Sequence, residues 1–127
     1  MRNSVKSVFL VVCLLVVLQS NVFSQGHWSP IIAEGLTQRV NHTATVVDGK
    51  IYLIGGVDGN GVLSGVEVFD PSIGLWTILT PPGFTPRIFP AACLVNDKIY
   101  VFGGSKFDSS ANRYDRTDIL EVYDPGE

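Results

Sequence analysis

Residues 39–52 read RVNHTATVVDGKIY and residues 87–100 read RIFPAACLVNDKIY, so the leading arginine and the closing Lys-Ile-Tyr recur at an offset of 48. Three further landmarks keep this offset: Gly55 with Gly103, Gly56 with Gly104, and Trp28 with Trp76. A fixed period of this length indicates a repeat protein, in which each copy is one supersecondary unit. The sequence therefore predicts two copies of one unit, at about residues 39–86 and 87–127.

Each copy reads as a series of short strands without a helix. In the first copy, apolar stretches flank Asp48-Gly49, which favours a type I′ hairpin because both central residues of that turn have positive φ. Asn96-Asp97 stands at the same place in the second copy. The strands expected for the first copy are residues 44–47, 51–54, 66–69 and 75–79. Four antiparallel strands in about 48 residues predict one blade of a β-propeller.

The two copies differ in length after the glycine pair. Residues 57–69 separate the pair from Asp70-Pro71, whereas residues 105–123 precede Asp124-Pro125 in the second copy. The second stretch is six residues longer and polar, so we expect the insertion to form a loop.

The repeat resembles the kelch motif, whose marks are an apolar run, a Gly-Gly pair, and then a spaced tyrosine and tryptophan. The matching residues are Gly55, Gly56, Phe69 and Trp76 in the first copy, Gly103, Gly104 and Tyr123 in the second, and Trp28 ahead of both. Phe69 departs from the family's tyrosine and lacks its hydroxyl. The resemblance implies an all-β chain of kelch-type propeller blades, in which the first strand of each blade lines a central channel and the fourth lies outermost.

About two blades are present, with an outer strand expected near residues 28–33, whereas a propeller closes from 4 to 8 blades. We therefore expect an incomplete ring. Either the chain is a fragment of a longer product, or several copies assemble into one ring. Open strand edges are templates for pairing between molecules, so self-association through blade edges is also expected.

Residues 1–24 have the composition of a secretory signal peptide. Arg2 and Lys6 precede an apolar run over residues 8–18, and Ser24 supplies a small residue at the expected cleavage site. A membrane anchor is the alternative, but a spanning helix needs about 20 apolar residues. We expect a secreted, periplasmic or extracellular protein that starts at Gln25 and meets the membrane only during export.

The charge of residues 25–127 argues against one class of protein, and a single cysteine excludes a disulfide within these residues. Removal of Arg2 and Lys6 leaves seven of the nine basic residues against 12 acidic ones, a net charge of −5 with the basic residues scattered. Nucleic-acid binding is therefore not expected. Cys93 is the one cysteine after the leader, and we expect it to be a small buried strand residue.

The patterns that carry catalysis or bind metals break at specific residues. The stretch from Asp58 begins like a calcium loop, but Val62, Leu63 and Phe69 replace the oxygen ligands. His27 and His42 lack the spacing of zinc ligands. The sequence thus predicts no catalytic residue, no metal site and no cofactor.

Two groups of residues are candidates for binding. Arg39 and Arg87 each precede an inner strand, where they would either bind a carboxylate at the channel mouth or hydrogen-bond to loops of the neighbouring blade. The second group is Arg113, Tyr114 and Arg116, in the long polar stretch. Tyrosine and arginine are enriched at protein interfaces, although an ordinary solvated loop has the same composition.

These observations favour a binding module that presents loops on a rigid propeller scaffold to a protein or glycan ligand. Two other functions stay open. Secreted kelch propellers include sugar-acid mutarotases and sugar oxidases, so the chain could belong to a carbohydrate-active enzyme, although fold alone does not establish chemistry. A structural or adhesive surface repeat is the third interpretation.

Overall fold

The computed structural model describes residues 26–31 and 34–127. The chain divides into two units, Met1–Ile31 and Ile32–Glu127. The predicted signal peptide lies outside the described residues. Residues 26–31 form no strand and Trp28 is fully exposed, while residues 32–33 of the expected outer strand are not described.

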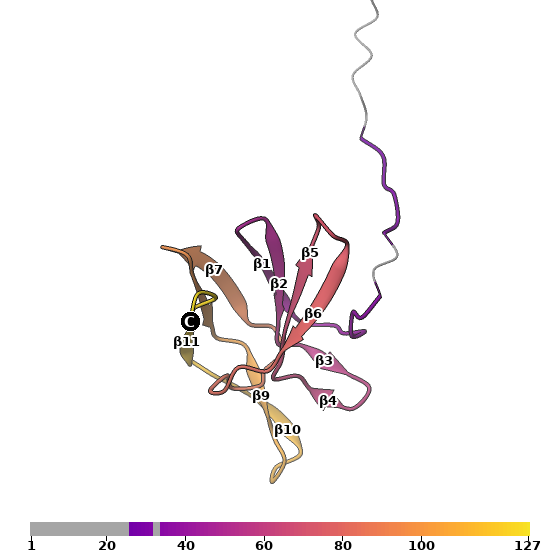
Figure 1. Ribbon diagram of the computed structural model, residues 1–127. Helices are drawn as coiled ribbons and strands as arrows, with labels where there is room; N and C mark the ends of the chain where they lie inside the picture. The colour runs from indigo at the N-terminus through magenta and orange to yellow at the C-terminus, as the bar shows by residue number, and fades with distance from the viewer. Residues whose placement is uncertain (1–25, 32–33) are drawn as a thin grey trace, which may run out of the picture. The chain divides into compact units, whose positions relative to one another are not determined.

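The described residues form eleven strands and no helix, and thus no helix that could cross a bilayer. Figure 1 shows the strands of the second unit as two sheets with two projecting hairpins. The strands are β1 (Thr43–Val47), β2 (Lys50–Ile54), β3 (Val57–Asp58), β4 (Gly61–Val62), β5 (Val66–Asp70), β6 (Leu75–Leu79), β7 (Ala91–Val95), β8 (Lys98–Phe102), β9 (Ser105–Asp108), β10 (Arg113–Arg116) and β11 (Leu120–Tyr123). The all-β prediction is confirmed.

The first sheet has four antiparallel strands in the order β1-β2-β5-β6, as expected for a complete blade. The second sheet has three, in the order β7-β8-β11. Strands next to each other in the first sheet follow one another along the chain or are separated only by a short hairpin. The sheets of residues 34–127 do not close into a ring.

The turns at the tip of each inner hairpin adopt the geometry that their residues predicted. Asp48 and Gly49 have φ values of 47° and 73°, and Asn96 and Asp97 have values of 48° and 62°. Positive φ at both central positions defines the type I′ turn, whose twist matches that of the flanking strands. The turn sets the register of the hairpin. Val47 lies opposite Lys50, and the following pairs continue outward from the turn without a bulge.

The stretches after the two glycine pairs are hairpins, so the prediction of a loop for the insertion in the second copy was wrong. β3 and β4 pair in the first copy, and the longer β9 and β10 pair in the second. Val40 and Ile88 each form an isolated bridge with the residue that follows the glycine pair, which anchors the base of the hairpin. The six added residues therefore lengthen a hairpin, and in Figure 1 β3–β4 projects to the lower right and β9–β10 downward.

The glycine pair allows backbone segments to approach closely. A Cβ on Gly55 would lie 2.7 Å from the carbonyl oxygen of Arg87, which belongs to the second copy. A Cβ on Gly56 would lie 2.7 Å from the carbonyl oxygen of Val40 in the same copy. The first contact shows that Gly55 lets the neighbouring blade approach, since no side chain fits at that distance.

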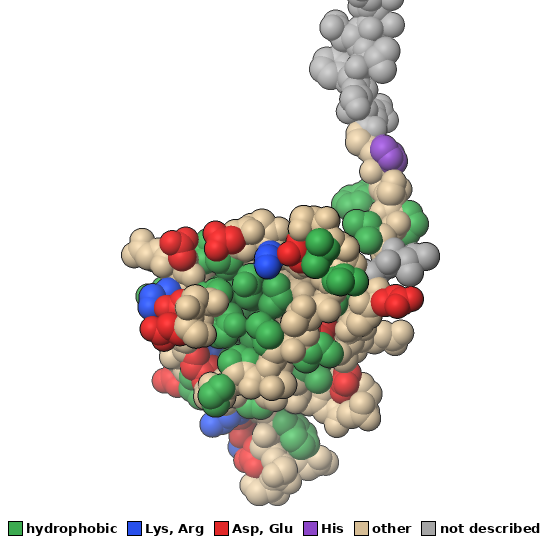
Figure 2. All heavy atoms as spheres, in the orientation of Figure 1, with side chains coloured by type: hydrophobic (Ala, Val, Ile, Leu, Met, Phe, Trp, Pro, Cys, Tyr) green, Lys and Arg blue, Asp and Glu red, His purple; other side chains and the backbone are tan. Residues whose placement is uncertain are grey.

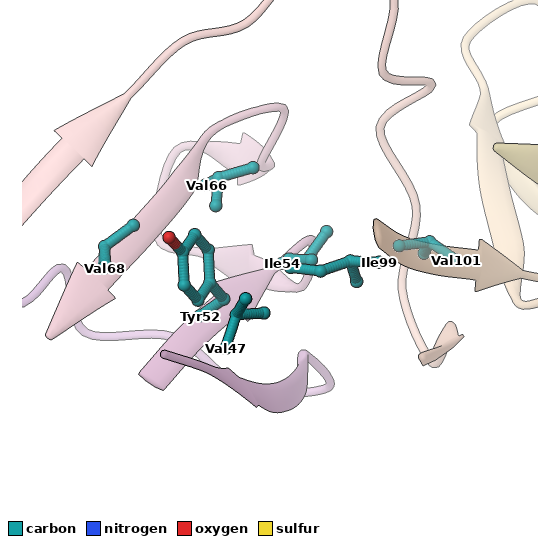
Figure 3. Packing of buried hydrophobic residues seen from close by; sticks show 7 residues of the cluster. All are labelled: Val47, Tyr52, Ile54, Val66, Val68, Ile99 and Val101. Atoms are coloured by element: carbon teal, nitrogen blue, oxygen red, sulfur yellow. The ribbon is translucent and has the colours of Figure 1, made fainter. Parts of the chain in front are cut away.

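The hydrophobic core lies between the two sheets (Figure 3). One face of the first sheet supplies Val47, Tyr52, Ile54, Val66 and Val68, and one face of the second supplies Ile99 and Val101. The ring of Tyr123 also lies 6.2 Å from that of Tyr52. Because side chains alternate along a strand, only one face of each sheet contributes to this shared core.

Trp76 packs inside the first blade. Its ring lies 5.0 Å from the ring of Phe69, its register partner, on the face of the sheet that points away from the second sheet. Trp76 therefore lies outside the core that the two sheets share. Alternation along β6 places the next residue, Thr77, and not Trp76, on the core face.

Candidate functional site

The side chain of Arg39 is buried in an ion pair within its own blade. Its Nη2 contacts Oε1 of Glu67, and the two side chains are only 3% and 2% exposed. Nη1 donates to the carbonyl oxygen of Gly55 at 3.1 Å, and the backbone N–H of Thr37 donates to the other oxygen of Glu67 at 3.1 Å. The pair joins the segment that enters the blade to its third strand, β5.

Arg87 repeats this arrangement in the second blade. Its Nη1 donates to Oε2 of Glu121 at 2.5 Å and to the carbonyl oxygen of Thr85 at 3.0 Å, while Nη2 donates to the carbonyl oxygen of Val101 at 3.0 Å. The guanidinium also lies 4.8 Å from the centre of the Phe84 ring. Oε1 of Glu121 accepts from the backbone N–H and the hydroxyl of Thr85.

The hydrogen-bond partners of both arginines lie in their own blade, and not in loops of a neighbouring blade as one interpretation of the sequence expected. Both guanidinium groups form ion pairs with glutamates of the chain itself. A role of the two arginines in binding a ligand stays a prediction. The sequence analysis missed Glu67 and Glu121, although a repeated signal marks them. Glu-Val-Phe-Asp-Pro begins at residue 67 and Glu-Val-Tyr-Asp-Pro at residue 121, and each glutamate is the partner of the arginine in its own copy.

The hairpin β9–β10 presents an exposed aromatic pair. Phe107 and Tyr114 are cross-strand partners whose ring centres lie 5.2 Å apart, and they are 45% and 46% exposed. The turn that supports them is closed by Asp108, whose Oδ1 accepts from the backbone N–H groups of Ser110 and Ala111. Such a pair contributes roughly 0.2–1 kcal/mol to a hairpin, yet it leaves a broad apolar surface in solvent.

The hairpin separates the three residues that the sequence grouped together. Side chains alternate along β10, so Tyr114 and Arg116 share one side of the hairpin and Arg113 lies on the other. Arg113 forms an ion pair of 2.9 Å with Asp115 on that second side. The sequence analysis missed Phe107, which completes the aromatic side and could be found only from the register of β9 against β10.

Cys93 is exposed, so the prediction of a buried strand residue was wrong. It lies on β7 opposite Tyr100, on the face of the second sheet that points away from the core. Ala92 and Leu94, its neighbours along the strand, point to the core side. Cys93 is exposed because no sheet of the described residues covers this face of β7.

Comparison with known families identifies the repeat. A model of the kelch motif matches residues 38–83 and 86–127, which together make up more than half of the chain. The chain therefore belongs to the kelch-repeat family, and its two sheets are blades of the β-propeller type, a fold that serves as a protein-interaction module. No curated protein matches the chain.

Proposed function

We propose that this chain is an extracytoplasmic kelch module that binds a protein partner through the aromatic side of the hairpin β9–β10. The observation that carries the proposal is the exposed Phe107–Tyr114 pair, 5.2 Å apart, on a hairpin that extends from the sheet. Arg116 lies on the same side of the hairpin. Aromatic residues and arginine are enriched at the centres of protein interfaces. Aromatic side chains offer a large contact area at a small cost in conformational entropy, and arginine offers several hydrogen-bond donors.

The scaffold suits this role because the hairpin is long where its counterpart is short. β3 and β4 have two residues each, whereas β9 and β10 have four each. Both hairpins start from the same position in the repeat, directly after the glycine pair. A variable element on a constant frame is where binding proteins place their specificity.

Substitutions on the two sides of the hairpin test the proposal. We expect Tyr114→Ala to weaken capture of a partner by at least about fivefold, which corresponds to about 1 kcal/mol. Arg113→Ala is the matched control, because it alters the same strand on the opposite side and should leave binding unchanged. Arg113→Ala should keep the thermal midpoint within about 2 °C of the wild type. Tyr114→Ala also loses the cross-strand aromatic pair, so its midpoint should fall by roughly 1–8 °C at most.

The assay is chemical crosslinking of the tagged chain to proteins of the extracellular fraction, followed by quantification of the captured protein with each variant. A parallel glycan array distinguishes a carbohydrate ligand from a protein ligand. Equal losses with Tyr114→Ala and Arg113→Ala would contradict the proposed surface. A fall in thermal midpoint without loss of binding would show that the aromatic pair is structural.

The export part of the proposal rests on residues 1–24, whose charged start and apolar run match a secretory leader. N-terminal sequencing of the chain recovered from a secreting host tests it. We expect the mature protein to begin at Gln25. A product that retains Met1 and stays with the membrane fraction would support an anchor instead.

A further inference from the structure

One face of the second sheet is apolar and uncovered. Phe102, Leu120 and Val122 are 44%, 62% and 55% exposed, and their register places them on the same side as Tyr100 and Cys93. Their counterparts in the first sheet are Ile54, Val66 and Val68, which are 1–8% exposed because the second sheet covers them. A separate group of hydrophobic side chains is visible in the middle of Figure 2, in the region between the two sheets of Figure 1.

The first sheet carries a hollow at the place where a preceding blade would contact it. The hollow has a volume of about 600 Å³, and its lining includes Leu36, Arg39, His42 and Leu53. The repeat counterparts of these residues are Phe84, Arg87, Pro90 and Val101, and they surround Ile54 and Gly55 at the contact between the two sheets. The residues of the hollow thus correspond in the repeat to the residues of the second sheet that contact the first sheet.

The backbone at the filled contact supplies two hydrogen bonds between the copies. The N–H of Gly56 donates to the carbonyl oxygen of Arg87 at 3.0 Å, and the N–H of Phe89 donates to the carbonyl oxygen of Asn41 at 2.8 Å. The counterpart groups are the N–H of Gly104 and the carbonyl oxygen of Phe89.

Neither counterpart group makes a backbone hydrogen bond within the described part of the chain. The space around Gly103 also shows that nothing in the described residues covers this face. The nearest atom to a Cβ built on Gly103 is 3.9 Å away, against 2.7 Å for its counterpart Gly55.

We infer that a second copy of this chain docks head to tail on the uncovered face. Phe102 of one copy enters the hollow beside Leu53 of the next copy, as Ile54 lies beside Val101 within the chain. The N–H of Gly104 then donates to the carbonyl oxygen of Arg39, and the N–H of Asn41 donates to the carbonyl oxygen of Phe89. The contact is heterologous, because it joins two different surfaces, and it leaves a free copy of each surface for further additions.

Two observations favour a second copy over an unrelated partner. The two surfaces are complementary in sequence, since the chain already joins their counterparts around its own core. The uncovered face also carries larger side chains than its counterpart, phenylalanine in place of Ile54 and leucine in place of Val66, and the hollow beside Leu53 has a volume of about 600 Å³. This inference concerns sheet faces, not strand edges, and does not depend on the hairpin proposal.

A mixing experiment with two blocked variants tests the inference. Leu120→Glu places a charge on the uncovered face but leaves the hollow intact, while Leu36→Glu does the reverse. We expect the wild-type chain to show an average mass above that of one chain, rising with concentration in sedimentation velocity. Each variant alone should be a monomer, and an equimolar mixture should form a dimer with one chain of each kind and nothing larger.

The outcomes separate the possible arrangements. Ile73→Glu, an exposed apolar-to-charged change in the turn after β5, is the matched control and should associate like the wild type. If Glu at position 120 prevents folding, judged by circular dichroism, Leu120→Ser supplies the same comparison. A wild-type monomer, a single variant that still self-associates, or a mixture of folded variants that forms no dimer would each overturn the inference.

Discussion

At the scale of single residues, a buried arginine–glutamate pair occurs once in each blade. Arg39 and Glu67 are 28 positions apart, and Arg87 and Glu121 are 34 apart, yet both pairs join the entry segment to the third strand. Both charges lose water on burial, which is offset only while the partner and the backbone hydrogen bonds are present. The pairs therefore fix how each blade is assembled, and they are sensitive to the loss of one member.

Glu67→Leu should lower the free energy of unfolding by about 3–5 kcal/mol, because it leaves the guanidinium of Arg39 buried without a counter-charge. Urea denaturation followed by tryptophan fluorescence measures the change. Glu121→Leu is the matched comparison and should cost less, since the side chain of Glu121 is 22% exposed and water can reach the site. Replacing both Arg39 by Met and Glu67 by Leu should recover part of the loss; a double variant as unstable as the single one would contradict this account.

Glu121 should also make stability depend on acid pH. Burial acts to raise its pKa, but hydrogen bonds from Thr85 and Arg87 and the charge of Arg87 outweigh that effect, so the pKa lies below the ordinary glutamate value. A carboxyl of this kind stabilises the fold above its unfolded pKa of about 4.3, and the stabilisation is lost as the pH falls through the lower folded pKa. Unfolding free energies measured from pH 6 to pH 3, a range of about three units around that value, should fall more steeply for wild type than for Glu121→Gln. Parallel curves would show that Glu121 is not the titrating group.

At the scale of elements, the two inner hairpins use one turn geometry with different residues. Gly49 adopts φ of 73° without a steric cost, whereas Asp97 adopts φ of 62° at the same position with a Cβ present. The second turn is therefore the more strained of the two. The comparison between copies identifies the substitution that relieves it.

Asp97→Gly should raise the free energy of unfolding by roughly 0.5–1 kcal/mol, since it restores the Asx-Gly pair preferred in type I′ turns. Thermal unfolding of the variant and the wild type measures the gain. Asp97→Ala is the control and should destabilise, because alanine combines a Cβ with none of aspartate's tolerance of positive φ. A gain with alanine equal to that with glycine would point to removal of the charge and not to the backbone.

At the scale of the whole molecule, two blades share one core and leave a face of the second blade open. Burial is therefore uneven: β5 is almost entirely buried, whereas alternate residues of β11 are exposed. A protein that gains contacts only when native copies meet becomes more stable as its concentration rises. The open face thus links stability to assembly.

The thermal midpoint of the wild-type chain should rise with protein concentration, because association favours the folded state by mass action. Differential scanning fluorimetry over a concentration series of roughly a hundredfold measures the shift. Leu120→Glu removes the docking face and should give a midpoint independent of concentration. A wild-type midpoint that does not move would contradict assembly through this face.

The local features of the fold could be predicted from the sequence. Asp48-Gly49 and Asn96-Asp97 specify their turns through the backbone, because few residues accept positive φ. Gly55 and Gly56 allow a close approach of backbone segments. Their recurrence as Gly103 and Gly104 is part of the kelch pattern that the sequence shows. These properties depend on neighbouring residues and repeat with the period of the chain, so each copy supports the interpretation of the other.

Tertiary structure decided which side chains meet and which are covered. The register of β9 against β10 places Tyr114 beside Phe107 and separates it from Arg113, although Arg113 is adjacent in sequence. Cys93 is exposed because its face of the second sheet has no neighbour, a fact about packing that local composition does not contain. Pairing between distant residues depends on where whole strands lie, whereas the turns depend only on what a few adjacent residues can adopt.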